Sequence, residues 1–238
     1  MAHIELSSNY QTKLMTSFSN LSQQQVESLL GFKFHEFYNS QIPIEEFITR
    51  TAPKKLKEKI FDRLIDCILS EGYPEATISS NNELVIIDNV GIILQVIVYY
   101  FKRTMKRNDL MLLRKQQIPS KNKQFDKNME FVIVQTTNNV ENNRYLLVVE
   151  PKSGSLEKRL IQLLWILKST WDINNDNKIV YGFLTTGINW QLIIYDGKSW
   201  KFSKPSSVLF ENMEEQEDQW LQKNTQILDV IYSILSSI

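Results

Sequence analysis

The spacing of the apolar residues changes near residue 131, and this change limits the possible folds more than any other feature of the chain. Before it, apolar residues in 53–71 and 83–107 recur every three or four positions, as they do in amphipathic helices. After it, two short β-branched runs, 131–135 and 145–149, flank the Asn-rich stretch 138–143. That pattern predicts a β-hairpin with a longer loop.

Residues 83–107 also permit a second interpretation, because their density of Val and Ile would suit strands. We expect one long helix, in which Gly91 costs about 1 kcal/mol relative to alanine. A shorter helix is predicted to follow Ser22, which can cap it. Another is predicted to start at Pro53 and to stop at Gly72.

The second half of the chain predicts one more helix and then strands. Ser155 can cap a helix that has a leucine-rich face. Runs at 179–184, 190–195 and 200–202 are typical of strands joined by tight turns. A terminal helix that carries Trp220 is expected to pack inward.

The order of these elements predicts a mixed α+β fold, with a central mixed sheet flanked by helices. We expect a helical N-terminal region at 1–78 and an α/β core at 79–205. The C-terminal helix, within 206–238, is expected to pack on the core.

Cysteine and histidine are too few for several kinds of site. The 238 residues include one cysteine, Cys67, and two histidines, so a disulfide framework and a zinc cluster are both excluded. Cys67 lies in an apolar run and is expected to be a buried, inert thiol, and His35 is expected to be an ordinary helix residue. The polar first twenty residues predict no secretory signal.

Polar residues within 84–101 argue against a membrane span, so we expect an intracellular protein of the cytoplasm or nucleus. The formal net charge is zero, but its distribution is uneven. Residues 101–127 hold nine Lys or Arg and two Asp, a local charge of +7. A nucleic acid is the partner that such a segment suggests, although a solvated helix end and loop would explain the charge equally well.

Glu150 and Lys152 stand two residues apart at the end of a predicted strand, so their side chains leave the same face. If the hairpin is symmetric about Val140, residue numbers that sum to 280 lie opposite each other, and Glu130 faces Glu150. Opposed carboxylates repel unless a cation lies between them. A divalent ion, Mg²⁺ or Mn²⁺, is the natural occupant. Gln162, on the following helix, could reach the same place.

An acid that opens a strand, a hairpin, Glu150-Pro151-Lys152 on the returning strand and a helix with Gln162 together resemble the PD-(D/E)XK nuclease superfamily. The stretch 181–190, YGFLTTGINW, looks like the strand–turn–strand that follows the active-site helix in restriction-endonuclease-like members. The likeness covers roughly residues 80–203 and extends to crinkler-type effector domains.

The resemblance implies a restriction-endonuclease-like core and a role for each matching residue. Glu130 and Glu150 would bind the metal, and Pro151 would offer it a carbonyl oxygen. Lys152 would act as base or charge stabiliser, with Gln162 as an auxiliary group. An acid on the preceding helix would complete the set; Glu83 and Asp88 both qualify, and Glu83 is favoured.

The sequence departs from the family pattern at two positions. Met129-Glu130 replaces the Pro-Asp pair, which makes the first ligand one methylene longer. Pro151 cannot donate to a sheet ladder in a strand that the pattern places centrally.

Two classes of function therefore remain open. The first is a metal-dependent nuclease that cleaves DNA or RNA through Glu130, Glu150, Lys152 and Gln162. The second is a nuclease-like fold without catalysis, which binds a protein, through a surface around Trp220, or a nucleic acid, through 101–127. The sequence leaves the oligomeric state open.

Overall fold

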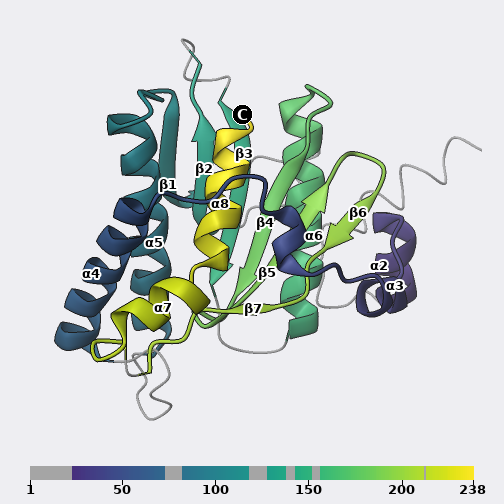
Figure 1. Ribbon diagram of the computed structural model, residues 1–238. Coiled ribbons are helices and arrows are strands. Elements are labelled where there is room, and N and C mark those ends of the chain that lie inside the picture. Colours follow the sequence, from purple (N-terminus) through teal and green to yellow (C-terminus); the bar gives the residue numbers. More distant parts are fainter. Residues whose placement is uncertain (1–22, 73–81, 118–127, 138–142, 152–155, 212) are drawn as a thin grey trace, which may run out of the picture.

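A mixed β-sheet lies between two layers of helices (Figure 1). The computed structural model describes residues 23–72, 82–117, 128–137, 143–151, 156–211 and 213–238. In that part of the chain the sheet has seven strands, in the order β1-β2-β3-β4-β5-β6, with β7 paired to β5. The predicted mixed α+β fold, with a sheet flanked by helices, is confirmed.

The strands run antiparallel to their neighbours except at one place. Their bounds are β1 Leu110–Gln117, β2 Asn128–Gln135, β3 Arg144–Pro151, β4 Val180–Thr185, β5 Asn189–Tyr195, β6 Trp200–Phe202 and β7 Ser206–Ser207. β3 and β4 are parallel, and the helix α6 (Leu156–Asn174) connects them. A parallel pair needs such a crossover, because a tight turn can join only antiparallel strands.

One face of the sheet is covered by three helices that share a single apolar core. These are α4 (Lys54–Glu71), α5 (Asn82–Arg103) and α8 (Gln226–Ser236). The long helix expected at 83–107 is confirmed as α5, although it ends four residues earlier than the pattern suggested. Gly91 lets α5 approach the sheet closely, since a Cβ there would lie 3.1 Å from the Phe131 ring.

The other face is covered by α6 and by two short N-terminal helices, α2 (Gln23–Leu30) and α3 (Phe34–Asn39). The predicted leucine-rich face of α6 is confirmed, with Leu160, Leu163, Leu164 and Leu167 all buried. Ser22 and Ser155, the expected caps of α2 and α6, lie outside the described residues.

β1 was not expected from the sequence, which assigned 101–127 to a helix end and a loop. Residues Leu110–Gln117 instead form the edge strand of the sheet and pair along β2. Lys115 has a positive φ of 48° within this strand. The strand escapes recognition because its second half, Arg-Lys-Gln-Gln, is polar, as edge strands often are.

The C-terminal segment forms two helices, α7 (Glu217–Lys223) and α8, where one was predicted. Trp220 packs inward, as expected of the terminal helix, so its own side chain does not form a contact surface. Its side chain is 3% exposed, packs edge-on against Phe61, and donates its indole N–H to the Leu209 carbonyl at 2.7 Å. Trp220 belongs to the core because α7 folds back onto α4.

Helices from all three expected segments, 1–78, 79–205 and 206–238, pack into one apolar core. Apolar residues of α4, α5 and α8 form one cluster, and a short 3-10 helix, η2 (Ile44–Phe47), contacts α8. Among the described helices, α5 is long and apolar enough, by length and composition, to cross a membrane. Just over half of that apolar window, 56%, is buried inside this fold.

Candidate functional site

The predicted register of the β2–β3 hairpin is confirmed where the strands pair regularly. Phe131 lies opposite Val149, and the next two pairs along the ladder keep the same sum of 280. The register shifts by one between Ile133 and Val134, on the side away from Glu150. The hairpin therefore brings the start of β2 beside the end of β3, as the metal-site hypothesis requires.

Glu150 is buried, with 2% of its surface exposed, and lies on the α6 side of the sheet. Its neighbours Val148 and Leu184 belong to the core beneath α6. Glu150 is two residues from Val148 and is paired with Leu184 in β4, and both relations put side chains on one face. A carboxylate at this depth needs compensating interactions, because burial of a bare charge is costly.

The structure brings the backbone of Glu130 to the carboxylate of Glu150. The Glu130 N–H donates to Oε2 of Glu150 at 3.3 Å. Regular side-chain alternation is interrupted here, since Met129 and Val132 both belong to the α6-side core although they are three residues apart. Glu130, which is half-buried, stands at that interruption.

The structure describes only some of the remaining predicted site residues. Lys152 lies outside the described residues, and the same holds for the side chain of Glu83 near the start of α5. Pro151 is buried as the last residue of β3, where it is paired with Thr185 of β4. Strand ends tolerate proline better than strand centres, which removes part of the difficulty that Pro151 posed.

Asp88 is held on the opposite side of the sheet from Glu150. It accepts a hydrogen bond from Nη2 of Arg114 at 3.3 Å, and both side chains are more than 40% exposed. Together they line a polar pocket of about 450 Å³ between α4, α5 and β1. Of the two candidate upstream acids, Asp88 is thus engaged elsewhere.

Cys67 lies in the wall of the same pocket and is buried, as expected. Burial and the nearby Glu71 raise the pKa of its thiol to about 11, so the group is protonated at neutral pH. His35 is an exposed residue of α3.

The helix α6 presents two polar side chains near the site. Gln162 is half-buried, as a group at the border of the core would be. Arg159, which the sequence did not single out, is 5% exposed. Helix periodicity could have placed Arg159 on the leucine-rich face, one turn before Leu163, but arginines at such positions ordinarily reach solvent.

Five strands and two helices meet at the end of the sheet that carries Glu150, called here the Glu150 end. β1, β3 and β4 finish there, and β2 and β5 begin there. α5 also begins near it, because a Cβ at Gly187, in the β4–β5 turn, would lie 3.1 Å from Ile86. The turns predicted at Gly187 and Gly197 are confirmed by their positive φ of 85° and 92°.

The basic segment 101–127 is divided between the two ends of the sheet. Arg107 lies at the far end, where it pairs with Asp109 at 2.9 Å. That contact, with a further hydrogen bond from Gln135, lowers the pKa of the Asp109 carboxyl to about 2. Arg114 and Lys115 lie nearer the Glu150 end, since Arg114 is paired with Phe131 of β2, and residues 118–127 lie outside the described residues.

Comparison with family models, curated proteins and solved structures finds no match to this chain. The site must be judged on its own chemistry. Within the described ranges no group of three or more His, Cys, Asp or Glu side chains converges as a metal site would. At the Glu150 end the structure shows the Glu150 carboxylate, bound by the Glu130 backbone N–H, and a site with so few protein oxygens suits an ion that keeps several waters.

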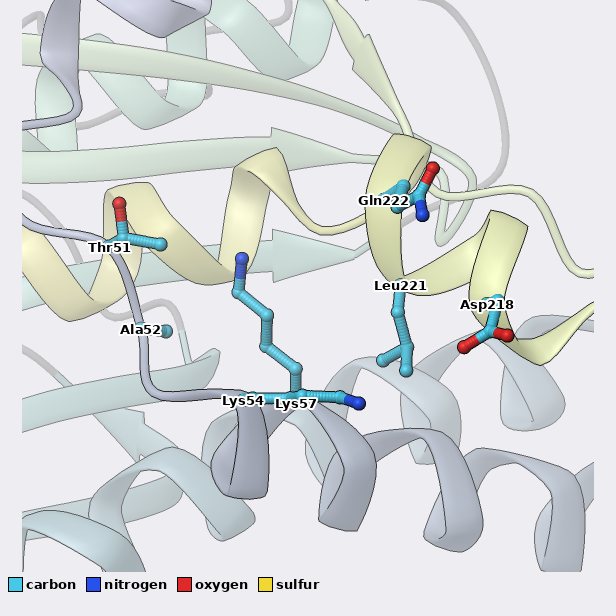
Figure 2. A pocket seen from close by; sticks show the side chains of 7 residues that line it. All are labelled: Thr51, Ala52, Lys54, Lys57, Asp218, Leu221 and Gln222. Atoms are coloured by element: carbon cyan, nitrogen blue, oxygen red, sulfur yellow. The ribbon is translucent and has the colours of Figure 1, made fainter.

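A second pocket, of about 330 Å³, lies between the start of α4 and α7 (Figure 2). Its lining includes Lys54 and Lys57. The Lys57 ammonium is engaged by Asp229 at 2.9 Å and by Thr225 at 3.1 Å, both at the start of α8. These contacts make Lys57 a tether between two helices.

Proposed function

We propose that the chain is a metal-dependent nuclease that hydrolyses phosphodiester bonds of DNA or RNA. The observation that carries the proposal is the buried Glu150 carboxylate at the end of β3, bound to the backbone of Glu130. A carboxylate at the end of a central strand, two residues before a lysine, is the arrangement that the nuclease resemblance requires. The order hairpin, helix α6, then β4 and β5 supports the same resemblance.

Glu150 and Glu130 would hold the ion, and Glu83 is the remaining acid that α5 offers near this end. Their oxygens are hard donors, which Mg²⁺ and Mn²⁺ prefer. The residues therefore fit the metal, with the carbonyl of Pro151 as a further oxygen. When bound, a divalent ion supplies Lewis acidity toward a phosphoryl oxygen.

The other residues have roles that their chemistry allows. Lys152 would accept a proton from a water or stabilise the negative charge that develops on phosphorus. Gln162 would orient that water or a substrate phosphate through its amide. Lysine and glutamine are suited to these roles because one carries a mobile ammonium and the other both donates and accepts.

The test is cleavage of single- and double-stranded DNA and RNA by the full chain, with Mg²⁺ or Mn²⁺ and with EDTA. Glu150→Gln, which keeps the shape and an oxygen for the Glu130 N–H, and Lys152→Met should each lower the rate at least a hundredfold. Glu58→Gln, an exposed carboxylate paired with Lys54 on α4, should leave it unchanged. Thermal unfolding of each variant shows whether the fold is retained.

Full activity in folded Glu150→Gln would refute these assignments. No hydrolysis of any substrate by the wild-type chain would favour the alternative, a nuclease-like fold that binds a protein or a nucleic acid without catalysis. The observation that favours this alternative is the absence, in the described ranges, of a third acid beside Glu150. Binding that is steeply salt-dependent and survives Glu150→Gln would identify the nucleic-acid form of it.

A further inference from the structure

Arg159 is one of three charged residues that are buried in the described part of the chain. The other two are Glu150 and Asp229. Asp229 lies in the opposite helical layer, where it binds Lys57. Among the described side chains, Glu150 and Arg159 are therefore the two buried charged groups in the layer between the sheet and α6. Their charges have opposite signs.

The packing of α6 on the sheet puts Arg159 level with Glu150. A Cβ at Gly182 would touch Leu163 and Leu167, so this part of α6 lies over Gly182. Gly182 is paired with Val148, and Glu150 is two residues further along β3, which is about 6.6 Å. At about 1.5 Å per residue, the same distance along α6 is four to five residues toward its start. Counted from Leu163 this reaches residues 158–159, and counted from Leu167 it reaches residues 162–163.

Arg159 also shares a helix face with Leu163, one turn further on. Its side chain is directed toward the start of the helix and down onto that face, because helical side chains tilt this way. α6 starts five residues after β3 ends, so a side chain that tilts toward the start of α6 extends toward the Glu150 end of the sheet.

We propose that Arg159 is a positioning residue of the site: its buried guanidinium balances Glu150 and limits how strongly the site attracts a divalent cation. The first half of this proposal concerns the two side chains alone, and the second half rests on the proposed nuclease function. A fixed positive charge in a buried layer opposes a second one nearby, so its removal should strengthen cation binding. A residue that served only to hold the fold would weaken binding when replaced, or leave it unchanged.

The balance is tested without metal by a double-mutant cycle on Glu150→Gln and Arg159→Met, with unfolding in urea as the readout. The two replacements together should cost less than the sum of their separate effects, by at least fivefold in the unfolding equilibrium constant. Additive effects would overturn the proposal. Arg159→Gln, which also removes the charge, replaces Arg159→Met in the cycle if that variant does not fold, and Arg159→Lys, which keeps the charge, should be the least destabilised of the three.

The cation test is Mn²⁺ titration of the folded variants by calorimetry. Arg159→Met should bind Mn²⁺ at least threefold more tightly than the wild type, while its Mn²⁺-dependent cleavage falls. Arg159→Lys should bind like the wild type, and so should Arg63→Met, a control on the exposed face of α4. Weaker or equal binding by Arg159→Met would overturn the proposal. No Mn²⁺ binding by the wild type would refute the metal site of the proposed nuclease, and the cycle would then decide the role of Arg159 alone.

Discussion

Removal of the Asp229 carboxylate should be among the most destabilising single changes in the C-terminal half. This side chain is 11% exposed and accepts two hydrogen bonds, one from the Ala52 N–H at 2.7 Å and one from the Lys57 ammonium at 2.9 Å. It thereby fastens α8 to the segment that leads into α4. Ser233, one turn further along α8, binds the backbone of Arg50 in the same way.

The magnitude follows from what Asp229→Ala leaves behind. A buried amide without an acceptor costs about 1–3 kcal/mol. Breaking a buried ion pair by removing one partner costs about 3–5 kcal/mol in all. Lys57 keeps Thr225 as an acceptor, and its side chain is 12% exposed, so we expect the lower end, about 3 kcal/mol. Asp229→Asn should cost about 2 kcal/mol, because an amide oxygen can still accept from Ala52.

The assay is urea unfolding at neutral pH, followed by far-UV circular dichroism. A matched control is Glu58→Ala, which breaks the exposed pair between Glu58 and Lys54 and should cost no more than about 0.5 kcal/mol. Replacement of Lys57 by Met in the Asp229→Asn background should restore part of the loss, since no ammonium is then left unpaired. A cost below about 1 kcal/mol for Asp229→Ala would refute this account of the tether, and so would additive effects in the double variant.

Two further predictions concern packing and pH. Gly182→Ala would place a Cβ 2.9 Å from Leu167, so α6 must move outward. We expect a loss of about 1–3 kcal/mol in the free energy of unfolding, measured in urea. An unchanged value would show that α6 moves outward without an energetic cost. The pKa of Asp109 is held near 2, below its ordinary 3.8, mainly by Arg107, so this carboxylate stabilises the fold above pH 3.8 and the contribution fades as the pH falls toward 2. Asp109→Asn should therefore flatten the acid side of the stability–pH profile from urea unfolding, and an identical slope in both proteins would contradict the ion pair.

The hairpin and α6 could be predicted from the sequence because local signals agreed there. The Asn-rich loop fixed the turn region, and the β-branched runs on either side specified one register out to Phe131 and Val149. The leucine spacing of α6 matched its buried face. The break in side-chain alternation at Glu130 has no such signal, because it depends on Met129 finding space beneath α6.

Burial of polar groups was the part that the sequence could not reveal. Arg159 is inside because Gly182 admits α6 close to the sheet, and that contact joins residues far apart in the chain. Trp220 was expected to pack inward with the terminal helix, but its partner Phe61 belongs to α4, far away in the chain, and no local signal identifies it. In both cases tertiary packing decides what local composition cannot.

The basic residues of 101–127 include two groups that lie apart in the sequence, so the contribution of each group to the proposed nucleic-acid contact can be tested separately. β1 ends and β2 begins at the Glu150 end, and the sequence between them, which lies outside the described residues, includes Lys121, Lys123 and Lys127. A second set of three cations, Lys102, Arg103 and Lys106, lies at the opposite end of the strands, where α5 finishes. Each set carries three positive charges.

A substrate that reaches Glu150 should therefore depend on the first set and not on the second. Replacement of Lys121, Lys123 and Lys127 by Gln should lower the slope of log affinity against log salt by about 0.9 for each duplex phosphate contact that is lost. The matching triple replacement at the far end should leave the slope unchanged, because those cations are a strand length away. Fluorescence anisotropy with labelled DNA and RNA measures both slopes. Equal losses of this slope in the two triple variants would mean that net charge alone governs binding. The substrate would then not bind preferentially at the Glu150 end.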